Sequence, residues 1–274
     1  MCSTRSFLAL SPETHMFVGR QSEVARVREA IRRRESLLIW GARGSGKRAL
    51  LAHSIAMMPQ PVNRRCLWAM GHGSPQEILR SIAQNLEQDP LFMARFRAET
   101  SRGASFSHWV SRQTSLRLRG LLYRAARAGE YWIILEDLAP MTSALKRIAK
   151  ELMVNQETPI YSTARGASYT ELGYGVQLYW NDRLKLYLGG LDSAAARELL
   201  EHSIQKFGLS RFNLQGFREE ILELSGSLPG AIIGMCAAAA DHRYHFHGRI
   251  KTKLLHVDYL MQRHEPRTPY EHSA

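Results

Sequence analysis

The sequence is poor in cysteine and in long apolar runs, and both shortages exclude whole classes of protein. Its 274 residues include three cysteines, Cys2, Cys66 and Cys236, spaced too widely for paired zinc ligands or a disulfide framework. The longest apolar runs, residues 131–135 and 231–240, are much shorter than the ~20 residues that a membrane-spanning helix needs. The N-terminal residues lack a basic segment followed by an apolar one. We therefore expect no secretory signal, no membrane partner and a cytoplasmic location.

Acidic residues are the second shortage. The chain has 25 Asp and Glu against 37 Lys and Arg, which gives a formal net charge of +12. Such an excess indicates a polyanionic partner and says nothing about the fold. Hydrophobic residues make up 45% of the chain, which is enough to bury a core, so the chain is not a disordered polybasic tail.

Short apolar runs and stretches of helical periodicity alternate along the chain. We expect strands at residues 36–40, 65–70, 131–135, 159–163 and 184–188. We expect helices to begin at Ser22 and, after a capping box, at Pro75, and to cover 47–57, 106–128, 193–207, 212–224, 229–240 and 248–261. This order predicts an α/β domain with a parallel sheet at 15–190, a helical domain at 191–263, and flexible ends at 1–14 and 264–274.

A glycine-rich segment joins the first expected strand to the helix after it. Residues 41–47 read Gly-Ala-Arg-Gly-Ser-Gly-Lys, the phosphate-loop pattern G-x-x-x-x-G-K in the context that the motif requires. Its backbone N–H groups would converge on phosphate oxygens, and Lys47 would reach the terminal phosphates. The alternative is an ordinary glycine-rich turn. We expect ATP as the cofactor, held by Gly41, Arg43, Gly44, Ser45, Gly46, Lys47 and Arg48.

The position after the loop lysine departs from the pattern. A Ser or Thr hydroxyl ligates magnesium there, whereas this chain has Arg48, which cannot coordinate a cation. The strand expected at 131–135 runs into Glu136 and Asp137, the acids of a Walker B element, whose first member is usually the shorter Asp. Glu136 is thus the candidate metal ligand, and Asp137 the candidate base or water-positioning residue.

Because both positions nearest the metal have changed, we hypothesise that Arg48 pairs with Glu136 where magnesium would otherwise lie. The alternative is that Arg48 faces solvent and that magnesium binds through phosphates and water. The two alternatives differ in whether Mg²⁺ is a cofactor at all.

Four further segments resemble boxes of the AAA+ and STAND families of P-loop ATPases, in the family order. Residues 16–23 resemble the F-V-G-R-x-x-E box, and residues 160–165 resemble the sensor 1 strand end T-S-R. Residues 188–200 resemble the segment that opens the helical lid, and residues 225–232 resemble the lid motif G-x-P-x-A-I. The resemblance is to the ATPases of transposition regulators and replication initiators.

This resemblance implies a sheet of strand order 5-1-4-3-2 with nucleotide bound between the α/β domain and the lid. It also implies that Arg165 faces the γ-phosphate as a catalytic residue, and that the nucleotide base lies near Val18, Gly19, Arg20 and Pro229. Relatives of the initiator type often carry an arginine where this chain has Gly230. The departures at Arg48, Glu136 and Gly230 put ATP hydrolysis in doubt more than ATP binding.

Arginines gather between Arg95 and Arg127, where Glu99 is the one acid. Phosphate-backbone binding needs such clusters. We expect contacts to nucleic acid, DNA more than RNA, from Arg112, Arg117, Arg119 and Arg124. The alternative is a solvated arginine-rich surface.

Together these features predict an ATP-binding AAA+/STAND-like protein that oligomerises and acts on nucleic acid. ATP would be mainly a conformational ligand, with weak or absent hydrolysis. We expect a homo-oligomer or a complex with other ATPase or recombination subunits. Two alternatives stay open: a STAND-type signalling or defence switch that binds a protein, and a structural pseudo-ATPase subunit.

Overall fold

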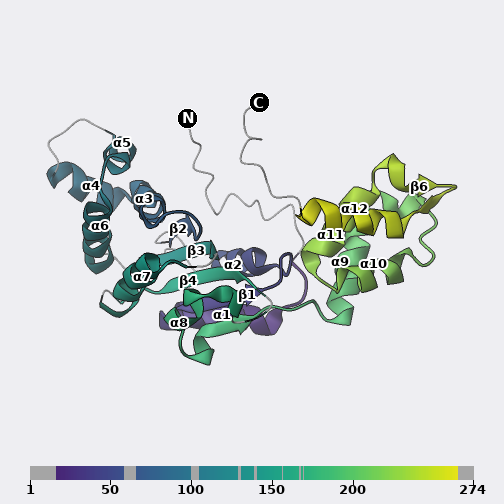
Figure 1. Cartoon of the computed structure of the whole chain (residues 1–274), viewed down its shortest axis with the longest axis horizontal. Helices are drawn as coiled ribbons and strands as arrows, with labels where there is room; N and C mark the ends of the chain where they lie inside the picture. The colour runs from purple at the N-terminus through teal and green to yellow at the C-terminus, as the bar shows by residue number, and fades with distance from the viewer. Residues whose placement is uncertain are drawn as a thin grey trace. The chain divides into compact units, whose positions relative to one another are not determined.

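A computed structural model of the chain describes residues 17–58, 66–99, 105–128, 131–138, 141–155, 157–166, 168 and 170–264 (Figure 1). They form two compact units. The first unit comprises residues 20–43 and 47–188, and the second comprises 17–19, 44–46 and 189–264. Of the expected flexible ends 1–14 and 264–274, residue 264 is the last of helix α12 (Thr252–His264), and the others lie outside the described residues.

The first unit is built on a five-stranded parallel sheet of order β2-β3-β4-β1-β5, which confirms the expected order. Its strands are β1 (Leu37–Gly41), β2 (Cys66–Met70), β3 (Trp132–Leu138), β4 (Ile160–Arg165) and β5 (Lys185–Tyr187). Its helices are α1 (Gln21–Arg33), α2 (Lys47–Ala56), α3 (Pro75–Asn85), α4 (Pro90–Glu99), α5 (Phe106–Ser111), α6 (Ser115–Ala128), α7 (Ser143–Asn155) and α8 (Tyr174–Leu178). Three 3₁₀ turns complete it: η3 (Leu86–Gln88), η4 (Thr170–Leu172) and η5 (Asp182–Leu184).

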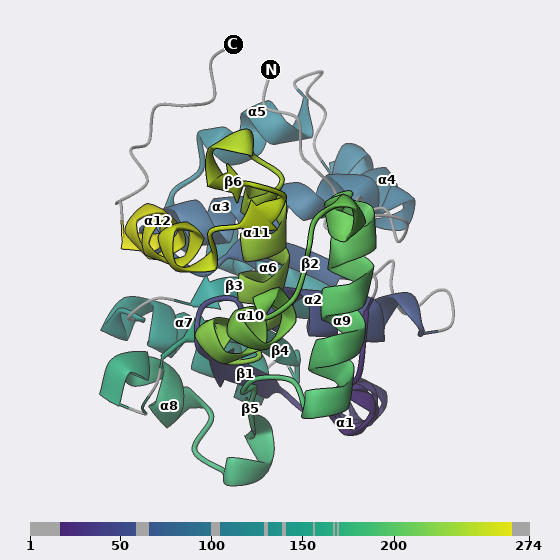
Figure 2. The same ribbon diagram turned by 90° about the vertical axis from the view of Figure 1, so that its right-hand side faces the viewer.

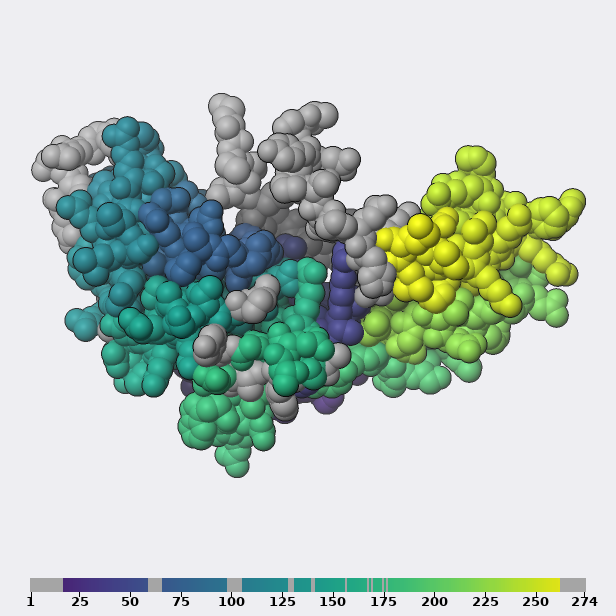
Figure 3. Space-filling model, in the orientation of Figure 1, coloured from purple at the N-terminus to yellow at the C-terminus, as the bar shows by residue number. Residues whose placement is uncertain are grey.

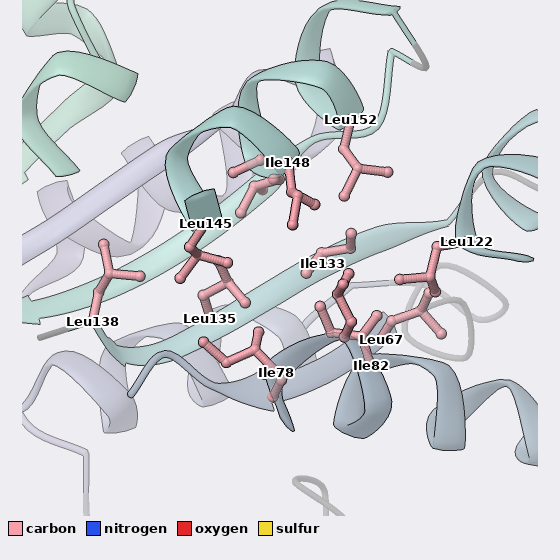
Figure 4. Close-up of a cluster of buried hydrophobic side chains, with 14 of the residues drawn as sticks. Leu67, Ile78, Ile82, Leu122, Ile133, Leu135, Leu138, Leu145, Ile148 and Leu152 are labelled. Atoms are coloured by element: carbon pink, nitrogen blue, oxygen red, sulfur yellow. The ribbon is translucent and has the colours of Figure 1, made fainter. Parts of the chain in front are cut away.

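The core of this unit lies where helices cover the sheet. Leucine and isoleucine side chains of α3, α7 and β3 meet in one buried cluster, shown in Figure 4: Ile78, Ile82, Ile133, Leu135, Leu145, Ile148 and Leu152. On β4, Tyr161 points to α1 instead, where its hydroxyl donates to the Ala30 carbonyl at 3.3 Å. Central strands buried in this way read as continuous apolar runs, which is why the sequence reveals them.

The expected capping box at the start of α3 is present. The Ser74 hydroxyl accepts from the Glu77 N–H at 3.2 Å, and the Glu77 carboxylate accepts from the Ser74 N–H at 2.7 Å. The helix expected at 106–128 is instead two helices, because the chain leaves the helical path at residues 112–114. Helices α4, α7 and α8 were not predicted.

The second unit is helical with one short hairpin. Its helices are α9 (Ser193–Lys206), α10 (Phe217–Ser225), α11 (Pro229–Ala239) and α12, joined by η6 (Leu209–Arg211), η7 (His242–Tyr244) and the hairpin β6 (His245–Phe246) with β7 (Arg249–Ile250). Helices α9 and α11 contact each other, and both are visible in Figure 2. The helix expected at 212–224 starts later, at Phe217, after Gly216 in the left-handed conformation. The hairpin was not predicted.

Helix α9 has a side-chain cap at its N-terminus. The Asp192 carboxylate caps α9 by accepting from the Ala195 N–H at 2.8 Å. None of the helices in the described ranges combines the length and apolar character that crossing a membrane requires.

Candidate nucleotide site

The phosphate loop follows β1 and runs directly into α2. Gly44 and Gly46 have φ angles of 87° and 90°, which side-chain-bearing residues rarely adopt, so the loop conformation requires glycine there. Lys47 opens α2, and its Nζ donates to the carbonyl oxygens of Gly41 at 2.9 Å and Ala42 at 2.8 Å. The lysine thus lies along the backbone of its own loop.

Burial lowers the pKa of Lys47 from 10.5 to about 8. The nearby Asp137 carboxylate opposes this shift, and the Arg165 guanidinium adds to it. A partly desolvated ammonium gains stability from any anion that approaches it. The environment of Lys47 therefore suits a phosphate group.

Arg48 and Glu136 form the hypothesised ion pair, with Arg48 Nε 3.0 Å from Glu136 Oε1. The other carboxylate oxygen accepts from the indole N–H of Trp68 at 3.0 Å. Glu136 is 8% exposed and Arg48 is 50% exposed, so the acid is buried and the guanidinium half open to water. Burial raises the pKa of Glu136, whereas Arg48 and Trp68 hold it down. Both oxygens of the candidate metal ligand therefore have donors.

These residues do not fit a magnesium ion. Magnesium needs oxygen ligands in near-octahedral geometry, usually from one or two carboxylates with phosphates and water. Arg48 offers no lone pair, and both oxygens of Glu136 already accept from a donor, so a metal ion would have to displace at least one of them. Within the described ranges, no group of three or more His, Cys, Asp and Glu could hold a metal either.

The end of β3 is bent at the second acid. Asp137 has a φ of 56°, and the pairing of β3 with β4 shifts register between Leu135 and Leu138. The Asp137 N–H donates to the Thr163 hydroxyl at 2.9 Å, which fixes the bend. The Asp137 carboxylate is paired with Arg165. The expected water-positioning acid and the expected γ-phosphate sensor therefore neutralise each other.

The second unit holds several of the other expected nucleotide residues. Val18 is buried in its core, and a Cβ on Gly19 would lie 2.8 Å from the Ala195 Cβ. The Gly230 N–H donates to the Gly44 carbonyl at 2.8 Å, and a Cβ on Gly230 would lie 2.8 Å from the Gly44 Cα. This close backbone contact leaves no room for an arginine at 230.

Pro229 and Arg20 are the remaining expected nucleotide residues. Pro229 opens α11, and its Cγ would lie 3.8 Å from a Cβ on Gly46. Arg20, in the first unit, forms an ion pair with Glu23 at 2.9 Å. Arg43 and Ser45 differ in burial, the first exposed and the second buried.

The four arginines expected to bind nucleic acid have different surroundings. Arg119 forms an ion pair with Glu151 at 2.8 Å, and its guanidinium lies 5.8 Å from the Tyr123 ring centroid. Arg112, Arg117 and Arg124 are exposed, and no carboxylate in the described part of the chain pairs with them. Arg119 is thus the one of the four that already has an internal partner.

No family model and no curated protein matches the sequence. Several solved structures, in contrast, match the fold of the chain. A Walker-type ATPase of Pyrococcus abyssi superposes with a TM-score of 0.57 at 15% identity over 94% of this chain and 78% of its own. Cdc6p of Pyrobaculum aerophilum gives 0.58 at 11% identity over 86% and 64%. AMPPCP-bound DnaA of Aquifex aeolicus gives 0.52 at 14% identity over 90% and 69%.

The chain has the α/β fold of P-loop ATPases. In this fold the phosphate loop, Glu136, Asp137 and Arg165 all lie at the carboxyl ends of parallel strands β1, β3 and β4. Ligands of open parallel sheets bind at that edge. This fold thus gathers the expected site residues of the first unit at one edge of the sheet.

Proposed function

We propose that this protein binds ATP as a conformational ligand, hydrolyses it weakly or not at all, and acts on DNA. The observation that carries the proposal is the Arg48–Glu136 ion pair beside a phosphate loop with its glycines and lysine in place. The loop supports phosphate binding, and the ion pair occupies the metal ligand. The site would therefore bind ATP but lack the metal ligand that ATP hydrolysis needs.

The chain's own groups divide the work of binding. Loop N–H groups and Lys47 would hold the phosphates, and Val18, Gly19 and Pro229 would flank the adenine. Bound ATP supplies a polyanion with three phosphates. Arg165 is released from Asp137 only if a stronger acceptor, such as a terminal phosphate, replaces that carboxylate. This exchange would let the protein distinguish a nucleotide that carries the γ-phosphate from one that lacks it.

DNA is the proposed polyanionic partner because exposed arginines without an ion pair in the described ranges remain outside the nucleotide site, as at Arg117 and Arg124. The Orc1 protein of Aeropyrum pernix, solved in complex with DNA, superposes with a TM-score of 0.53 at 14% identity over 94% of this chain and 69% of its own. We further propose a cytoplasmic oligomer, formed with itself or with other ATPase or recombination subunits.

The test of the ATP proposal compares nucleotide affinity in magnesium and in EDTA, together with phosphate release. We expect similar affinity in both and turnover far below ~1–10 per second. The matched variant is Arg48→Thr with Glu136→Asp, which restores the usual ligands and should make affinity depend on magnesium. Wild-type turnover in the normal range, dependent on magnesium, would contradict the proposal.

The test of the DNA proposal is filter binding of duplex and single-stranded DNA at two salt concentrations. Binding through phosphates weakens steeply as salt rises. No binding at low salt would favour the alternative of a switch that binds a protein.

A further inference from the structure

The hairpin β6–β7 and its flanks form a basic segment of the second unit that contains no acidic residue. Residues 242–257 contain no Asp or Glu, and their cations are Arg243, Arg249, Lys251 and Lys253. The hairpin projects from the helices of this unit, as Figure 1 and the space-filling view in Figure 3 show. A charged element in this position can reach a partner that the helices cannot.

The pairing of the two strands decides which side chains face outward. His245 lies opposite Ile250, and Phe246 lies opposite Arg249. Ile250 is buried in the core of the unit, so the neighbouring pair, Phe246 with Arg249, belongs to the other face. The Lys251 N–H donates to the Tyr244 carbonyl at 2.8 Å and so extends the ladder.

Phe246 is 56% exposed, which is unusual for an aromatic side chain without a partner to cover it. The Lys251 ammonium lies 4.6 Å from its ring centroid. The hairpin is also anchored, because the Asn213 N–H donates to the Gly248 carbonyl at 2.8 Å. An exposed ring and a cation are therefore presented together on a fixed backbone.

Three of the four cations of this surface lack an acidic partner among the described residues. Arg249, Lys251 and Lys253 are exposed, and none lies within ion-pair distance of a carboxylate in the described residues. Arg243 differs, because Asp241 and Asp258 lie 3.4 Å and 3.9 Å from its nitrogens. The outer part of the hairpin thus carries uncompensated charge.

We propose that the outer face of hairpin β6–β7, formed by Phe246, Arg249 and Lys251, binds single-stranded nucleic acid. A base would stack on the Phe246 ring while neighbouring phosphates contact the two cations, the combination by which single strands are held without sequence preference. Duplex DNA hides the faces of its bases, and one inserted ring gives little hold on a bilayer. This inference rests on the proposed action on nucleic acid and identifies the surface of the protein that contacts the strand.

The experiment is fluorescence anisotropy on the full chain with a labelled thymidine oligonucleotide of about 15 nucleotides and its abasic counterpart. Phe246→Ala should weaken binding to the thymidine strand about tenfold and leave the abasic strand unchanged, because one stacking contact is lost. Phe246→Tyr keeps the ring and should bind as the wild type does. Arg249→Ala with Lys251→Ala should reduce the slope of log affinity against log salt by about 1.4.

The matched control removes two cations from α9 of the same unit, Arg197→Ala with Lys206→Ala, and should leave both strands and the slope unchanged. If the wild type binds no DNA of either kind, the proposed function falls together with this inference. If the wild type binds and Phe246→Ala binds equally well, only the hairpin inference is overturned. Binding to phosphatidylglycerol vesicles that needs Phe246, with strand binding unaffected, would also overturn it.

Discussion

Cations at the edge of the sheet and cations on the hairpin are in opposite situations. At the sheet edge, Arg48 pairs with Glu136 and Arg165 pairs with Asp137. On the hairpin, Arg249 and Lys251 have no such partner among the described residues. A net charge of +12 therefore does not describe one surface. Part of the basic side chains is neutralised inside a site, and part is left for a partner from outside.

The difference follows from the cost of leaving each charge alone. Glu136 is 8% exposed, so losing its partner leaves a buried carboxylate without compensation. An exposed ammonium is solvated by water and needs no partner to be stable. Paired cations should thus affect stability and nucleotide binding, whereas unpaired ones should affect partner binding alone. Substitutions in the two regions test this division.

The largest effect is expected at Lys47, the cation that opens α2 directly after the phosphate loop. Lys47→Ala should weaken ATP binding about 100-fold or more, because a partly desolvated phosphate contact is worth ~3 kcal/mol or above. Binding of a fluorescent ATP analogue measures it. Lys150→Ala, which removes an exposed lysine from α7, is the control and should bind ATP normally. Equal affinity of both variants would remove the phosphate loop from the nucleotide site.

Arg48→Ala should lower the free energy of unfolding by about 2 kcal/mol near neutral pH, because Glu136 stays buried without its cation. Burial already raises the pKa of Glu136 above its value in the unfolded chain, and losing Arg48 raises it further. The folded variant therefore takes up a proton before the unfolded chain does as pH falls from neutral toward about 4.5. The destabilisation should be smaller at about pH 5 than at about pH 8.

Chemical denaturation of wild type and variant at both pH values measures this prediction. Adding Glu136→Gln to Arg48→Ala removes the buried charge and should recover part of the loss. A destabilisation that is the same at both pH values would mean that the Glu136 charge is not its cause.

Much of this comparison could be predicted from the sequence, because it depends on short-range patterns. Buried parallel strands read as apolar runs, and the loop glycines are required by backbone angles, so the strands and the position of the loop were predictable. The order of the strands was implied by the resemblance to AAA+ and STAND ATPases and not by these patterns. The Arg48–Glu136 pair was predictable because each residue departs from its motif at the position nearest the metal. The hydrogen bond from Trp68 to Glu136 was not, since it joins neighbouring strands whose register no motif specifies.

Other features depend on balances that the sequence does not display. The break between α5 and α6 falls in a stretch with helical periodicity on both sides, so only packing decides it. Strands β6 and β7 have two residues each, too few for an alternating pattern. The pairing of Arg165 with Asp137 depends on the bend at Asp137, which places a non-glycine residue at positive φ. Such positions carry no sequence signal.

A smaller effect is expected from the titration of Lys47. Its pKa of about 8 in the free protein should rise when a phosphate stabilises the charged form. ATP binding then takes up a proton above pH 8, so affinity should fall about tenfold between about pH 7.5 and pH 9. Lys47→Arg keeps its charge throughout and should bind ATP with affinity independent of pH in this range. An unchanged pH dependence in Lys47→Arg would assign the titration to another group.

The smallest effect on the free energy of unfolding is expected for the hairpin cations, and a small effect is what distinguishes them from the paired cations. Arg249→Ala with Lys251→Ala should change the free energy of unfolding by less than ~0.5 kcal/mol, because exposed cations without an ion pair contribute little to stability. Thermal and chemical unfolding measure it beside Arg48→Ala under one set of conditions. A loss of ~1 kcal/mol or more would mean that the contact of Lys251 with the Phe246 ring holds the hairpin together. The hairpin cations would then resemble those at the sheet edge, and the exposed ring would be part of the fold instead of a surface for a base.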